Sequence, residues 1–92
     1  MIIRIMGEGQ YEVPGSLFDE LNSIDNRIVE LVGKGNEADY RTELLKLINV
    51  VKSNGKPIDD SSIVESNIIV PPEDLSLEEA TEIFTGSGLL ED

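Results

Sequence analysis

A chain of 92 residues with a formal net charge of −12 and neither cysteine nor histidine excludes several classes of protein. The length suits one domain with a modest core, and the missing side chains rule out disulfides, thiolate metal sites and a histidine base. Hydrophobic residues are 39% and charged residues 28% of the chain, which is typical of a globular domain and not of a disordered one.

The N-terminal segment predicts a β-hairpin. Residues 2–6 are apolar and largely β-branched, with Arg4 as their one charge, and residues 10–13 alternate in polarity. Gly7 and Gly9 flank the turn between them, where glycine supplies the positive φ of a tight hairpin. Because the first strand starts so close to Met1, we expect it to be central in its sheet or otherwise held in place.

Residues 16–32 predict an amphipathic helix of about four turns. Ser16 is a candidate cap, and Asp19 and Glu20 fall in the first turn, where the helix dipole favours acids. The apolar residues at helical spacing are Leu17, Leu21, Ile24, Ile28, Leu31 and Val32. The polar residues that we expect to face water are Asn22, Asp25, Asn26 and Glu30. Gly33-Lys34-Gly35 ends this helix.

A second helix is predicted to begin after a cap at Asn36. Its apolar face is expected to contain Tyr40, Leu44, Leu47, Ile48 and Val51. Lys52 and Lys56 lie at or just beyond its end, where cations suit the dipole, and Asn54-Gly55 predicts a left-handed stop. Since the linker between the two helices is short, we expect an antiparallel helical hairpin.

The C-terminal third contains a third strand and a last helix. After a polar loop that begins at Pro57, residues 63–64 suggest a short extended piece, and residues 68–70 are β-branched and end at Pro71-Pro72. Ser76 and Glu79 have the spacing of a capping box, which predicts a helix from Leu77 to about Thr85.

These elements predict one α+β domain over residues 1–92. The N-terminal β-hairpin and the third strand would form one layer. An antiparallel helical hairpin, together with a short C-terminal helix, would pack against that layer. The sequence leaves the oligomeric state open.

The negative charge is concentrated in residues 57–92, which hold ten of the nineteen acids and neither lysine nor arginine. Such a field repels phosphate backbones and anionic lipid headgroups, so it disfavours direct binding to nucleic acid or membranes, whereas a basic protein partner is compatible with it. The sequence shows neither a signal peptide nor an apolar run of the roughly 20 residues that span a bilayer. We therefore expect a cytoplasmic protein.

Candidate chemical motifs are weak. Gly7-x-Gly9 lacks the third glycine of the dinucleotide fingerprint, since position 12 is Glu, and a hairpin turn explains it better. Pairs of adjacent acids occur at Asp59-Asp60, Glu73-Asp74 and Glu78-Glu79, but the spacing of a calcium loop is absent. No nucleophile has a visible activating base. We expect no enzymatic activity, no cofactor and no specific metal.

Two segments carry a resemblance to a known family. Residues 3–11 (IRIMGEGQY), and residues 66–72 (SNIIVPP) followed by residues 77–80 (LEEA), resemble the phage-shock-protein-A-associated (PspAA) domain family. Two helices between these segments fit the layout of that family, so the likeness extends over the chain. The resemblance implies a non-enzymatic partner in the stress response, associated with the coiled-coil phage-shock A protein that protects stressed membranes.

The interpretation that follows is an adaptor or regulator that binds a coiled-coil membrane-stress protein of the phage-shock A type and reaches the membrane only through it. The residues expected to contact that partner are Tyr11, Pro71, Pro72, Glu73, Asp74, Glu78, Glu79 and Glu82. Two alternatives are open. The acids could imitate phosphate charge and shield a nucleic-acid-binding partner, or carboxylates could serve a small metal-dependent enzyme.

Overall fold

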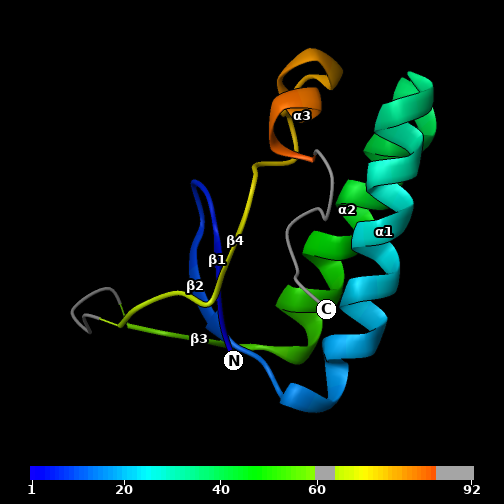
Figure 1. Cartoon of the computed structure of the whole chain (residues 1–92). Helices are drawn as coiled ribbons and strands as arrows, with labels where there is room; N and C mark the ends of the chain where they lie inside the picture. Colours follow the sequence, from blue (N-terminus) through cyan, green and yellow to red (C-terminus); the bar gives the residue numbers. More distant parts are fainter. Residues whose placement is uncertain (60–63, 85–92) are drawn as a thin grey trace.

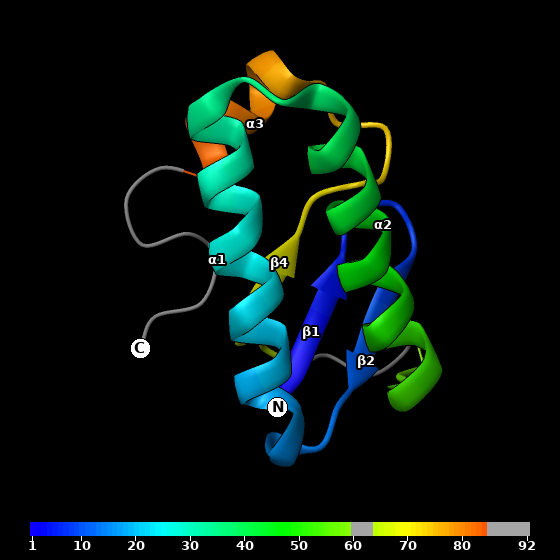
Figure 2. The same cartoon turned by 90° about the vertical axis from the view of Figure 1, so that its right-hand side faces the viewer.

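Two long antiparallel helices lie against one face of a small mixed sheet in the computed structural model, which describes residues 1–59 and 64–84 (Figures 1 and 2). The strands are β1 (Ile2–Ile5), β2 (Gly9–Glu12), β3 (Lys56–Pro57) and β4 (Ile68–Val70). The helices are a 3₁₀ turn (Gly15–Leu17), α1 (Phe18–Lys34), α2 (Glu37–Asn54) and α3 (Leu77–Ile83). The predicted α+β architecture is confirmed.

The sheet has the strand order β3-β2-β1-β4, so β1 is central, as its position in the sequence predicts. It pairs antiparallel with β2 and parallel with β4, and the turn glycines Gly7 and Gly9 have φ values of 86° and 122°. The two-residue strand β3, which pairs Pro57 with Tyr11, is too short to leave a periodic signal and was not predicted. Val64 is not in a strand, and Ile63 lies outside the described residues.

The start of α1 differs from the prediction, because Ser16 does not cap it. Ser16 lies inside the 3₁₀ turn, and the amides of Leu17 and Phe18 donate instead to the carbonyls of Pro14 and Gly15. The Gly15 carbonyl thus satisfies the Phe18 amide, one of the donors that a serine cap would have served. The α-helix begins at Phe18, with Leu17 in the cap position and no side-chain cap.

Asp25 was expected in water, and it is fully buried. It lies four residues after Leu21 and three before Ile28, and these positions share one face of an α-helix. The helical spacing therefore predicts that Asp25 is buried, whereas its charge wrongly predicts that it faces water. The other members of the expected polar face are a half-buried Asn22 and exposed Asn26 and Glu30.

The expected apolar face of α2 is confirmed, since all five of its members are buried. Asn36 caps this helix by accepting a hydrogen bond of 3.3 Å from the Asp39 amide. The prediction of a left-handed stop at Gly55 is wrong, because its φ of −95° and ψ of 158° are extended. The left-handed residue is Gly35, at the end of α1 with a φ of 71°.

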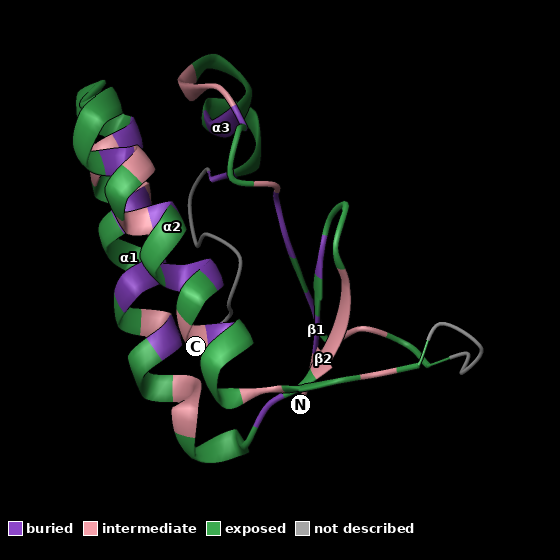
Figure 3. Ribbon diagram, turned by 180° about the vertical axis from the view of Figure 1, so that it is seen from behind, coloured by how far each residue is buried: buried purple, intermediate pink, exposed green. Residues whose placement is uncertain are grey.

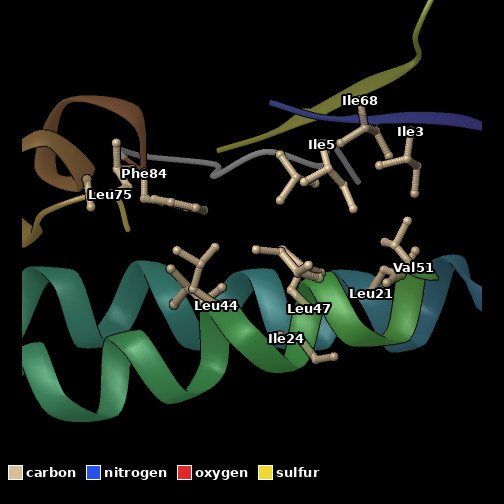
Figure 4. Close-up of a cluster of buried hydrophobic side chains, with 14 of the residues drawn as sticks. Ile3, Ile5, Leu21, Ile24, Leu44, Leu47, Val51, Ile68, Leu75 and Phe84 are labelled. Atoms are coloured by element: carbon tan, nitrogen blue, oxygen red, sulfur yellow. The ribbon is translucent and has the colours of Figure 1, made fainter. Parts of the chain in front are cut away.

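The core lies between the sheet and the helical hairpin. Ile3, Ile5 and Ile68 point from the strands toward the apolar faces of α1 and α2 (Figure 4). Buried residues line the inner side of both helices (Figure 3). At the far end of the hairpin, Leu75 and Phe84 extend the core over Leu44 and attach α3.

A complete capping box opens α3, as predicted. The Ser76 hydroxyl accepts the Glu79 amide at 3.1 Å, while the Ser76 amide and hydroxyl both donate to Oε1 of Glu79. The helix ends at Ile83, and Thr85 lies outside the described residues.

Removing this cap should loosen α3 without unfolding the domain. Ser76→Ala leaves a helix amide unpaired and should cost about 0.5–2 kcal/mol, so hydrogen exchange should accelerate selectively within residues 77–83. Ser76→Asp retains a good cap and should exchange like the parent. Equal exchange in the alanine variant and the parent would mean that packing alone holds the helix.

Candidate partner-binding surface

Most of the acids expected to contact a partner lie on the connection between β4 and α3, or on α3 itself. Glu73 and Asp74 are exposed on the connection. Glu78 and Glu82, one turn apart on α3, are also exposed. Neither Glu73 nor Asp74 forms an ion pair within the part of the chain that the structure describes. These carboxylates are therefore available to an external cation.

A hollow of about 370 Å³ separates this connection from the tip of the β1–β2 hairpin. Its lining residues are Met6, Gly7, Glu8, Pro72, Glu73 and Asp74. The hollow thus combines three carboxylates with the thioether of Met6 and the ring of Pro72. A lining that contains both apolar and acidic side chains suits the aliphatic stem and charged head of a lysine or arginine side chain.

Lys52 of α2 partly neutralises the hairpin tip. Its Nζ lies 2.5 Å from Oε1 of Glu8, and this hydrogen bond raises the pKa of Lys52 above its usual value. The pair joins the hairpin to α2 and holds Glu8 at the edge of the hollow. The charge that remains available in the hollow is therefore mainly that of Glu73 and Asp74.

Glu79 has a different environment from the other acids of α3. Its carboxylate is already engaged by Ser76 in the capping box. A change at Glu79 would therefore alter the helix start as well as the charge, unless the replacement is glutamine, which also serves in capping boxes.

Two predicted contact residues lie apart from the acids. Pro71 is buried, and only its neighbour Pro72 reaches the hollow. Tyr11 pairs with Ile3 in the sheet register, so its side chain lies on the helix-facing side, where it is half-buried against the core. The structure brings Pro72, Glu73 and Asp74 together and places Tyr11 on another surface.

A second, shallower groove runs along the outer side of α2. Its volume is about 430 Å³, and its lining includes Leu45, Lys46 and Val50. Leu45 lies off the buried face of α2, and 41% of its surface is exposed. This groove lacks acidic residues, unlike the hollow at the hairpin tip.

Comparison with known proteins identifies the family of this chain. The family model described as PspA-Associated protein matches residues 1–92. The chain belongs to the PspA-associated family. No curated protein and no solved structure matches it.

This family's name describes association with PspA, which is itself a protein. In this PspA-associated protein, none of the described helices has both the length and the hydrophobicity needed to cross a bilayer. Residues 1–59 and 64–84 contain no group of three acids placed to hold a metal ion.

Sequence reasoning missed Met6 and Glu8, which share the hollow with the predicted residues Pro72, Glu73 and Asp74. A usable signal was present for Met6. Because side chains alternate along a strand, burial of Ile3 and Ile5 places Arg4 and Met6 on the opposite face. No local pattern indicated that the hairpin tip and the connection after β4 meet, since they are more than 60 residues apart.

Proposed function

We propose that this PspA-associated protein is a non-enzymatic adaptor or regulator of the membrane-stress response, which binds a coiled-coil protein of the PspA type. It acts in the cytoplasm and reaches the membrane only through that protein. The observation that carries this proposal is the family match over the whole chain. The absence of cysteine and histidine from the sequence supports a role without catalysis.

The contact surface that we propose centres on the hollow at the hairpin tip and continues along the acidic side of α3. Glu73 and Asp74 would receive basic side chains of the partner, and Glu78 and Glu82 would extend the negative field beyond the hollow. Exposed charges act mainly on the rate of association, because they guide the partner before contact is made. This action is screened beyond about 8 Å at physiological salt.

Charge neutralisation tests this surface. The double variant Glu73→Gln with Asp74→Asn should associate with purified PspA-type protein on the order of tenfold more slowly at low salt, with a flatter salt dependence. Dissociation should change less, because apolar contacts govern it. Stopped-flow or surface-binding kinetics at two salt concentrations measure both rates.

The chain offers a matched control in Asp19→Asn with Glu20→Gln. Both residues are exposed in the first turn of α1, and the change in composition and net charge is identical. This control should associate nearly as fast as the parent. Equal slowing of the two variants would show that only total charge matters and would remove the hollow from the proposal. Absence of binding by the parent chain would contradict the proposed function itself.

A further inference from the structure

The sheet has two very different faces. Helices α1 and α2 both lie on one side of the strands, and no described helix covers the other side (Figures 1 and 3). The side chains that alternate with the buried ones define this open face: Ile2, Arg4, Gln10, Glu12 and Ile69, with Met6 directly after the end of β1. A sheet normally packs its apolar residues against a second layer, so apolar side chains on an open face require an explanation.

The two most exposed large hydrophobic side chains of the described residues lie on the open face or at its edge. Ile69 is 53% exposed and Met6 49%. The other three large hydrophobic side chains that are exposed, among them Val64, are 40–41% exposed. Gln10 holds the Val64 segment at the face by donating to the Val64 carbonyl at 2.9 Å and to the Ser66 hydroxyl at 2.7 Å.

Arg4 lies at the centre of this face. The register places it directly between Gln10 of β2 and Ile69 of β4. It is exposed and has no ion pair with any described residue, although the chain contains 19 acids and only seven bases. Its neighbours on this face are both apolar (Ile2 and Ile69) and polar (Gln10 and Glu12). A guanidinium can bind a carboxylate through two hydrogen bonds.

The dimensions of the face fit one helix. Strands β2 and β4 lie on either side of β1. Since neighbouring strands are about 4.8 Å apart, the axes of β2 and β4 are about 10 Å apart. An α-helix with its side chains is about 10–12 Å wide.

A second copy of the chain fits the face less well. Four residues of β1 span only about 13 Å, so the face alone offers a few hundred Å², against roughly 800 Å² per partner in a stable complex. An occupant must therefore also contact the acidic hollow that Met6 lines. Each copy also carries a net charge of −12, which opposes self-association.

We propose that the open face binds an amphipathic helix of the PspA-type protein. This inference rests on the proposed function and adds the open face to the contact surface that the hollow provides. The apolar stripe of the helix packs on Ile2, Met6 and Ile69, and a carboxylate beside the stripe pairs with Arg4. Because Met6 also lines the hollow, cations on the same helix reach Glu73 and Asp74.

Thiol protection tests this proposal cleanly because the parent chain has no cysteine. Ile69→Cys places a thiol on the open face, and Leu45→Cys places a matched thiol on the outer side of α2. At a concentration of purified PspA-type protein about ten times its Kd, roughly nine-tenths of the chain is bound, so maleimide labelling of Ile69→Cys should slow about tenfold. Labelling of Leu45→Cys should stay unchanged.

Charge reversal provides an independent measurement. Arg4→Glu should weaken binding at least about tenfold, because it sets two carboxylates against each other. Lys46→Glu makes the same change of charge on α2 and should bind like the parent. Circular dichroism verifies that both exposed substitutions leave the fold intact.

Each other outcome overturns the inference. If the parent binds but both thiols react at unchanged rates, or if only Leu45→Cys is protected, the open face is not the contact while the proposed function stands. Protection of Ile69→Cys that rises with the concentration of the chain alone would show that a second copy occupies the face. If the parent does not bind at all, the proposed function and the inference fail together.

Discussion

Replacing Tyr40 by alanine should lower the free energy of unfolding by about 3–5 kcal/mol, the usual cost of deleting a buried aromatic side chain. Tyr40 is fully buried at the end of the helical hairpin. Its ring meets Phe84 edge-on, with centroids 6.4 Å apart, and its hydroxyl donates to the Leu75 carbonyl at 2.9 Å. One side chain thus attaches both ends of the α3 segment to α2, so its loss should also release α3.

Urea unfolding and hydrogen exchange measure the two effects, and Tyr40→Phe separates them. The phenylalanine variant keeps the ring contact and leaves the Leu75 carbonyl unpaired, which should cost about 1–3 kcal/mol. Exchange within residues 77–83 should accelerate more in Tyr40→Ala than in Tyr40→Phe. If the alanine variant were no less stable than the phenylalanine variant, the ring would not be part of the attachment.

The difference in stability between the parent chain and Tyr40→Phe should depend on pH. Burial raises the pKa of the Tyr40 phenol above its ordinary value of 10.0. The unfolded chain therefore loses this proton first, so the contribution of Tyr40 is fully present below pH 10 and decreases as the pH rises above it. The stability of the parent should fall more steeply with alkaline pH than that of Tyr40→Phe. Parallel curves would contradict the burial of the hydroxyl.

Gly55→Ala should destabilise the domain by about 1–3 kcal/mol, because the added methyl group overfills a packed site. A Cβ at this position would lie 2.6 Å from the Val51 carbonyl oxygen and 3.0 Å from Cβ of Tyr11. The nearest atom belongs to the α2 backbone and cannot rotate away. The backbone of Gly55 is extended, so the penalty comes from space and not from a left-handed conformation.

Gly33→Ala is the control, and its effect should have the opposite sign. Gly33 lies within α1 and a Cβ there would meet nothing within 4 Å, so alanine should stabilise the helix by about 0.5–1 kcal/mol. Chemical denaturation of both variants under one set of conditions gives the comparison. A stable Gly55→Ala variant would mean that the junction of α2 and β3 can shift away from Tyr11.

Much of the fold could be predicted because its causes are local. The apolar periodicity of α2, the cap at Asn36 and the capping box of Ser76 and Glu79 each depend on residues within a few turns of one another. The hairpin likewise follows from glycines between a short apolar strand and a strand that alternates in polarity. Helix and turn formation obey these short-range rules, so a single sequence is enough to read them.

The solvent exposure and the packing of individual residues were predicted less reliably, because both depend on which residues the rest of the chain covers. The charge of Asp25 suggests a surface residue, whereas its spacing from Leu21 and Ile28 suggests a core residue. In the folded chain Asp25 is buried, as the spacing indicates. Gly55 was interpreted by its residue type, whereas the closeness of Val51 and Tyr11 explains why it must be glycine. Of the two residues that crowd Gly55, Val51 is four residues away in α2, and only Tyr11 is distant in the sequence.

Composition and local pattern account for the helices, the hairpin, the acidic C-terminal third and membership of the PspA-associated family. The tertiary structure was needed to show that Met6 and Glu8 meet Glu73 and Asp74 in one hollow. It also decided that Arg4 lies between Gln10 and Ile69 on an open face. Both surfaces arise from the parallel pairing of β1 with β4, a contact between segments more than 60 residues apart. Such pairings follow from burying the whole core at once, and no local pattern records them.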